Sequence, residues 1–72
     1  MTLNAEQLVA MTYTNYKGIT AVRVILPRRV WFGSTEWHKE NQWLLEATDI
    51  EKGELRHFAM ADISDWTPKT DS

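Results

Sequence analysis

The segment Ile19–Leu26 constrains the fold of this chain more than any other part of the sequence. Its β-branched residues favour a strand, and successive side chains of a strand point to opposite faces. One face carries Thr20, Val22, Val24 and Leu26, and the other carries Ile19, Ala21, Arg23 and Ile25. Both faces are therefore largely apolar, and Arg23 interrupts one of them. Such a strand is expected where a small sheet curves tightly, as in a small barrel.

Turn-forming residues divide the rest of the chain into further short strands. The segment Asn15–Gly18 is predicted to form a turn in which Gly18 can adopt a positive φ. Pro27 cannot donate a ladder hydrogen bond, so it marks a bend or an edge, and the strand resumes after it. The resumed part covers Arg28–Phe32, and four further strands are expected at Val9–Thr14, Gln42–Ile50, Leu55–Met60 and Ser64–Thr67. The other expected elements are a loop at Ser34–Asn41, a hairpin turn at Glu51–Glu54 and a 3-10 turn at Ala61–Ile63.

Five short strands cannot form a stable open sheet with two exposed edges, and closure into a barrel removes most of those edges. A 3-10 turn before a short final strand indicates an SH3-like or Sm-like barrel. We therefore predict a mainly β protein, a small SH3-like (Sm-like) five-stranded barrel over residues 9–67. A short N-terminal helical turn capped by Asn4 precedes it within residues 1–8, and a polar tail, residues 68–72, follows it.

The length of 72 residues allows one domain, and the absence of cysteine excludes a disulfide framework. A packed core must therefore hold the fold. No segment approaches the length of a transmembrane helix, and the N-terminus does not read as a signal peptide. We expect a cytoplasmic protein that does not act at a membrane.

A series of short motifs resembles the WYL domain family over roughly residues 9–66. The motifs are Met11-Thr12-Tyr13, Gly18, Arg23-Val24-Ile25-Leu26-Pro27, Trp43-Leu44-Leu45 continuing into Glu46-Ala47-Thr48-Asp49, the trio Gly53, Arg56 and Phe58, and finally Ile63. The resemblance implies an SH3-like barrel whose groove binds nucleic acid or another negatively charged ligand. Arg23 and Arg56 match the family, whereas Leu44, Ala59 and Asp62 replace a Tyr and two Arg residues.

The resemblance also implies a biological setting. WYL domains usually follow a winged-helix DNA-binding domain in bacterial transcription regulators. Only residues 1–8 precede the predicted barrel, so we expect a free-standing WYL-like domain that acts in bacterial or phage regulation or defence.

The charge is unevenly distributed along the chain. Residues 1–39 carry five basic and two acidic residues, a net charge of +3, whereas residues 40–72 carry three basic and eight acidic residues, a net charge of −5. Together they give the net charge of −2. This asymmetry predicts either one anion-attracting face or two ordinary solvated faces, and the chain is too weakly basic for strong non-specific nucleic-acid binding.

Five residues are candidates for ligand binding: Arg23, Arg56, Arg28, Arg29 and His57. Arg23 and Arg56 could form an anion-binding pair with bidentate geometry, or Arg23 could instead pair with Glu46 or Asp62 across the sheet. His57, next to Arg56, belongs either to the groove or to the strand surface.

Arg28 and Arg29 precede the aromatic residues Trp31 and Phe32, an arrangement that suits single-stranded nucleic acid. The alternative is a charged edge strand with one of the aromatic residues in the core. Trp31 and Trp37 are candidate partner contacts, and Trp37 could also fold back as a lid on the barrel.

Catalytic and metal-binding patterns are absent from the sequence. There is no Gly-x-Ser-x-Gly elbow and no Gly-rich phosphate loop, and His38 between Glu36 and Glu40 does not match a metal-ligand spacing. We expect a non-enzyme without metal or cofactor. Its predicted function is regulatory binding of an anionic ligand such as single-stranded nucleic acid, and the alternative is an SH3-like scaffold that docks a protein partner. Either function is compatible with a homodimer formed through an edge strand.

Overall fold

The computed structural model describes residues 7–69, which form five strands and one short 3-10 helix. The elements are β1 (Val9–Thr14), β2 (Thr20–Gly33), β3 (Gln42–Asp49), β4 (Glu54–Ala59), η1 (Met60–Asp62) and β5 (Ile63–Pro68). All strand pairs are antiparallel and belong to one sheet with the order β4-β3-β2-β1-β5. The prediction of a mainly β fold with five strands is therefore confirmed.

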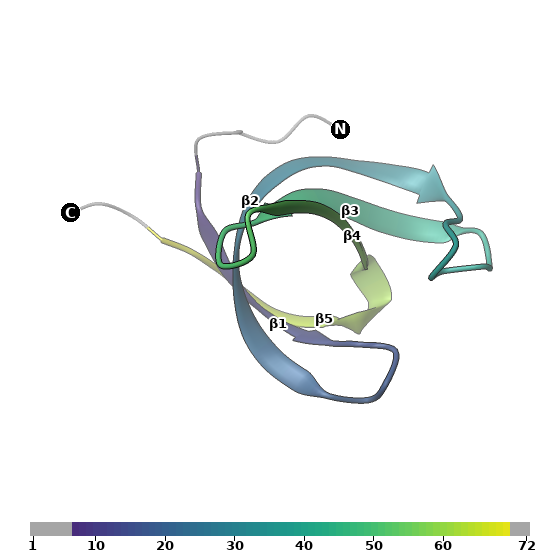
Figure 1. Ribbon diagram of the computed structural model, residues 1–72, viewed down its shortest axis with the longest axis horizontal. Coiled ribbons are helices and arrows are strands. Elements are labelled where there is room, and N and C mark those ends of the chain that lie inside the picture. Colours follow the sequence, from purple (N-terminus) through teal and green to yellow (C-terminus); the bar gives the residue numbers. More distant parts are fainter. Residues whose placement is uncertain (1–6, 70–72) are drawn as a thin grey trace.

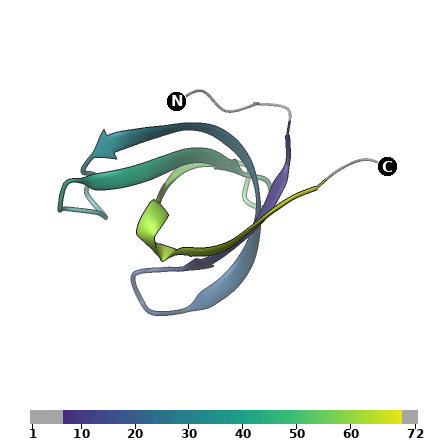
Figure 2. The same cartoon turned by 180° about the vertical axis from the view of Figure 1, so that it is seen from behind.

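The sheet is strongly bent, and β2 contributes to both halves of the bend (Figures 1 and 2). The first half of β2 pairs with β1, and its second half pairs with β3. The register with β3 shifts between Pro27 and Arg29, and a bulge of this kind bends a strand and increases its twist. The bend predicted at Pro27 therefore lies inside one continuous strand of 14 residues.

The core lies on the inner face of the bent sheet. Val9, Met11 and Tyr13 project there from β1, as their alternation in the sequence predicts. The other buried members of the core are Ile25 from β2, Leu45 and Ala47 from β3, and Phe58 from β4. The rings of Tyr13 and Phe58 meet edge to face with their centroids 4.9 Å apart. Residues far apart in the sequence therefore hold the two halves of the sheet together.

The predicted closure of the barrel is not observed. Within residues 7–69, β4 pairs with β3, β5 pairs with β1, and no pairing joins β4 to β5. The single turn η1 connects these two edge strands and carries the chain from β4 across to β1 (Figure 1). The sheet therefore remains open between its two edge strands, β4 and β5. The gap that separates β4 from the β1–β2 hairpin is called the seam below.

The predicted N-terminal helical turn falls mainly outside the described residues. Gln7 and Leu8, its described part, are not helical. The Gln7 side-chain amide donates a hydrogen bond of 2.7 Å to the Lys69 carbonyl oxygen, and the Lys69 N–H donates one of 2.8 Å to the Leu8 carbonyl oxygen. The residues before β1 and after β5 thus prolong the pairing of these two strands.

One hydrogen bond ties the two sides of the seam together next to η1. The backbone N–H of Ala59 donates to the Tyr13 hydroxyl oxygen at 3.1 Å, and both residues are buried. Burial raises the pKa of the Tyr13 hydroxyl above its ordinary value, the hydrogen bond from Ala59 opposes this shift, and the charge of Asp62 adds to it. Tyr13 therefore stays protonated in the folded state at a pH where an exposed tyrosine ionises.

Replacing Tyr13 with Phe is expected to lower the free energy of unfolding by about 1–2 kcal/mol, because the buried Ala59 N–H loses its acceptor. In the parent protein, stability should also fall as the pH rises above about 10, because the unfolded state then releases the tyrosine proton that the folded state retains. Urea unfolding at about pH 8 and about pH 11 measures both effects. The Tyr13→Phe variant should lose part of this pH dependence, and an unchanged pH dependence would contradict the assignment.

Candidate functional site

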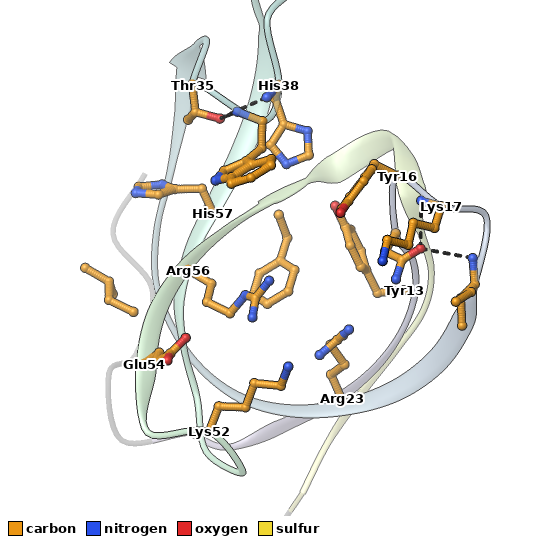
Figure 3. Close-up of a pocket in the computed structure, with 15 residues that line it drawn as sticks. Tyr13, Tyr16, Lys17, Arg23, Thr35, His38, Lys52, Glu54, Arg56 and His57 are labelled. Atoms are coloured by element: carbon orange, nitrogen blue, oxygen red, sulfur yellow. Dashed lines mark hydrogen bonds between the residues drawn. The ribbon is translucent and has the colours of Figure 1, made fainter.

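A pocket of about 590 Å³ opens along the seam (Figure 3). Its walls come from the β1–β2 hairpin, the β2–β3 loop, and β4 with the turn that precedes it. In the hairpin, the side-chain oxygen of Asn15 accepts the N–H groups of Lys17 and Ile19 at 2.9 and 3.0 Å. Gly18 completes this turn with a φ of 80°, as predicted. The turn places Tyr16 and Lys17 at the pocket.

Basic side chains outnumber acidic ones in the pocket. Lys17, Arg23, Lys52 and Arg56 line it, and Glu54 is the one carboxylate among its described lining residues. Figure 3 shows Arg23, Lys52 and Arg56 extending from β2, the β3–β4 turn and β4 toward the same space. Cations that converge in a partly enclosed space create a positive potential, which favours an anionic ligand.

The buried residue Asp49 organises two of these cations. Its Oδ2 lies 3.3 Å from Nη1 of Arg23, and its Oδ1 accepts the backbone N–H groups of Glu51 and Lys52 at 3.1 and 3.3 Å. One carboxylate therefore holds both Arg23 and the turn that carries Lys52. In one of the two alternatives, Arg23 was expected to pair with Glu46 or Asp62, and this prediction is wrong because its partner is Asp49. Asp49 lies opposite Ile25 in the register, and Ile25 is the next residue of β2 after Arg23 whose side chain points inward.

Arg23 keeps further capacity to donate hydrogen bonds. Its Nε is buried and has no hydrogen-bond partner within residues 7–69. A buried donor without an acceptor is unfavourable, and charged groups make the penalty larger. A carboxylate or phosphate oxygen bound next to Arg23 could accept this hydrogen bond.

Two aromatic side chains form the rim of the pocket. The rings of Tyr16 and Trp37 stack with their centroids 6.0 Å apart and their planes inclined by 29°, and the side chains are 73% and 69% exposed. The hydroxyl of Thr35 accepts the N–H groups of Trp37 and His38 at 3.2 and 3.0 Å, which fixes the local shape of the β2–β3 loop beside the pocket. Trp37 thus borders the pocket and remains available to a ligand or partner.

The outer face of the sheet carries a second polar cluster, which lies outside the pocket apart from His57. Arg29 forms two hydrogen bonds of 3.3 Å with Glu46, and its guanidinium lies 5.7 Å from the Trp31 ring centroid. The Trp31 indole N–H donates to Nδ1 of His57 at 3.2 Å. A Cβ at Gly33 would collide with the Trp31 ring, so glycine at this position leaves room for the indole.

The structure separates the predicted site residues into two groups. Arg23, Arg56, His57 and Trp37 line the pocket, although the His57 ring points away from its centre (Figure 3). The His57 ring accepts a hydrogen bond from Trp31, which lies outside the pocket. The second group, Arg28, Arg29 and Trp31, lies outside the pocket: Arg28 is exposed on β2, and the other two belong to the outer-face cluster.

Three pocket residues, Lys17, Lys52 and Tyr16, were not predicted from the sequence. Each lies in a hairpin turn beside Gly18 or Gly53, and both glycines have positive φ values. The glycines mark the two turns in the sequence. Only the bend of the sheet brings the two turns, with their lysines, to one pocket. The cations of the pocket also come from both halves of the chain, so the +3 segment does not form the basic surface by itself.

No family model, curated protein or solved structure matches this chain. Within the described part of the chain, no helix is long and apolar enough to span a membrane. The same residues contain no group of three or more metal-ligating side chains.

Proposed function

We propose that this protein is a WYL-like binding module, built on an SH3-like barrel with an open seam, that binds an anionic ligand in the basic pocket. The observation that carries this proposal is the convergence of Arg23, Lys52 and Arg56 on one space (Figure 3). The resemblance of the sequence to WYL domains, whose groove takes negatively charged ligands, supports the same function. A role in bacterial or phage regulation or defence is part of this proposal.

The arrangement of charges at the pocket also supports this function. The cations line one pocket although the chain as a whole has a net charge of −2, and Asp49 pairs with the guanidinium of Arg23 and holds the backbone of the turn that carries Lys52. Like charges brought together repel one another, so an arrangement of this kind is favourable when an anion is bound. An exposed aromatic rim of Tyr16 and Trp37 adds a surface on which a planar group could stack.

A titration with anionic probes tests this function. We expect pyrophosphate or a fluorescent oligothymidylate of about 15 nucleotides to bind with a Kd below about 1 mM at low salt, and added salt should weaken the binding. The double variant Arg23→Ala plus Arg56→Ala should bind more weakly than Lys69→Ala, in which the removed cation lies outside the pocket. Binding that is insensitive to salt and to the double variant would overturn the proposal.

A protein-docking role is the second candidate, and a specific pair of side chains favours it. Phe32 and Trp43 are each 57% exposed and contact each other edge to face, with ring centroids 5.4 Å apart. Exposed aromatic residues are frequent in protein interfaces. If a protein partner binds through this pair, the double variant Phe32→Ser plus Trp43→Ser should abolish partner binding. Removal of the pocket cations should then leave partner binding intact.

A further inference from the structure

The strand β4 is an edge of the sheet and also a wall of the pocket. It is one of the two terminal strands in the sheet order, and its residues Glu54–Phe58 line the pocket. An edge strand presents backbone N–H and C=O groups that another extended chain can pair with. The basic side chains and the free edge of β4 therefore face the same opening.

The hydrogen bond at Ala59 shows which backbone groups face this opening. The Ala59 N–H points across the seam to the Tyr13 hydroxyl, and in an antiparallel ladder every second residue directs its backbone groups to the same side. The N–H and C=O groups of His57 and Leu55 therefore also point into the seam. Side chains alternate in the same way, so Arg56, two residues before the buried Phe58, projects to the inner face.

We propose that the anionic ligand is an acidic segment of a partner protein, which binds in extended form as an additional strand on β4. This inference rests on the proposed function and specifies the ligand of the same pocket. Backbone hydrogen bonds to Leu55 and His57 position the segment, and its inward side chains repeat about every 7 Å. Carboxylates at these alternate positions meet Arg56, Arg23 and Lys52, while Tyr13 and Ala59 mark the closed end of the seam.

Charge favours this ligand over two other candidates for the seam. A long polyanion such as nucleic acid would extend beyond the local cations over a chain of net charge −2, whereas a short acidic segment can stay beside those cations. A second copy of the chain paired antiparallel through β4 would bring the Arg56 side chains of the two copies close together. Like charges directly opposite one another in a sheet are destabilising.

The test compares three forms of one fluorescent heptapeptide of alternating glutamate and valine. The first is unmodified, the second has N-methyl groups on the valine amides, and the third has them on the glutamate amides. All three have the same charge, but each methylated form blocks the hydrogen bonds of only one edge. One methylated peptide should bind at least about tenfold more weakly than the unmodified one, and the other should bind within about threefold of it.

Two controls make this experiment decisive. The Arg56→Gln variant should weaken binding of the unmodified peptide, and the matched Lys69→Gln variant, with its charge removed outside the pocket, should not. An equal effect of the two methylation patterns would overturn strand addition. If pyrophosphate or oligothymidylate binds while the peptides do not, the strand-addition inference is wrong and the basic pocket keeps its proposed function; if none of the probes binds, both are wrong.

Discussion

The variant Arg56→Glu is expected to bind anionic ligands at least about 30-fold more weakly than the parent protein. Arg56 lies on the inner face of β4 and points into the pocket (Figure 3). A unit charge about 4 Å from an anion contributes about 1 kcal/mol even at the dielectric constant of water, and reversing its sign doubles the change. The resulting loss of about 2 kcal/mol corresponds to the expected change in Kd.

Three variants separate this effect from a loss of folding. Arg56→Gln keeps a polar side chain of similar length and should give an intermediate Kd, while Arg29→Glu changes a cation that lies on the outer face against Glu46. Lys69→Glu changes a cation outside the pocket without breaking a side-chain ion pair of the described structure. Circular dichroism checks that each variant retains the fold. Equal losses of binding in Arg56→Glu and Lys69→Glu would show that net charge alone governs the affinity.

The variant Asp49→Ala is expected to lower the free energy of unfolding by about 3 kcal/mol. The buried carboxylate accepts one hydrogen bond from Arg23 and two from the turn at Glu51 and Lys52, and all three are lost together. Removal of one member of a largely buried ion pair also leaves the other without its counter-charge. Urea unfolding at neutral pH measures the difference.

The variant Asp49→Asn divides this effect into its parts. The asparagine oxygen can still accept the two turn N–H groups, so this variant should lose about half as much stability as Asp49→Ala. A double-mutant cycle of Asp49→Ala with Arg23→Ala then isolates the ion pair. A loss below about 0.5 kcal/mol for Asp49→Ala would contradict the central position that the structure gives this residue.

Local patterns were sufficient to predict the strands and the inner face of the first of them. The alternation of Val9, Met11 and Tyr13 identified core residues, and Gly18 marked a turn, because both signals depend on nearest neighbours in the chain. The pairing of Arg23 could not be predicted in this way. Its partner Asp49 is 26 residues away, and its position follows from the register between β2 and β3.

The open seam lies beyond what the sequence could predict, and so does much of the pocket. Closure of a small sheet is a reasonable expectation from the cost of free edges, but the short connection η1 leaves β4 unpaired on one side. Lys17 and Lys52 reach the pocket only because the bend of β2 brings two distant hairpin turns to the same opening. The register shift between Pro27 and Arg29 also reverses the alternation of side chains along β2. Arg29 and Trp31 therefore lie on the outer face, away from Arg23.

The position of the bound anion tests the account most directly, and a nuclear magnetic resonance titration can locate it. In a ¹⁵N-labelled sample titrated with an anionic probe that binds, the largest shift changes should occur at the Nε–H groups of Arg23 and Arg56 and at the backbone amides of Leu55 and His57. Changes confined to Arg28, Arg29 and Trp31, or to Phe32 and Trp43, would contradict an anion-binding pocket in the seam.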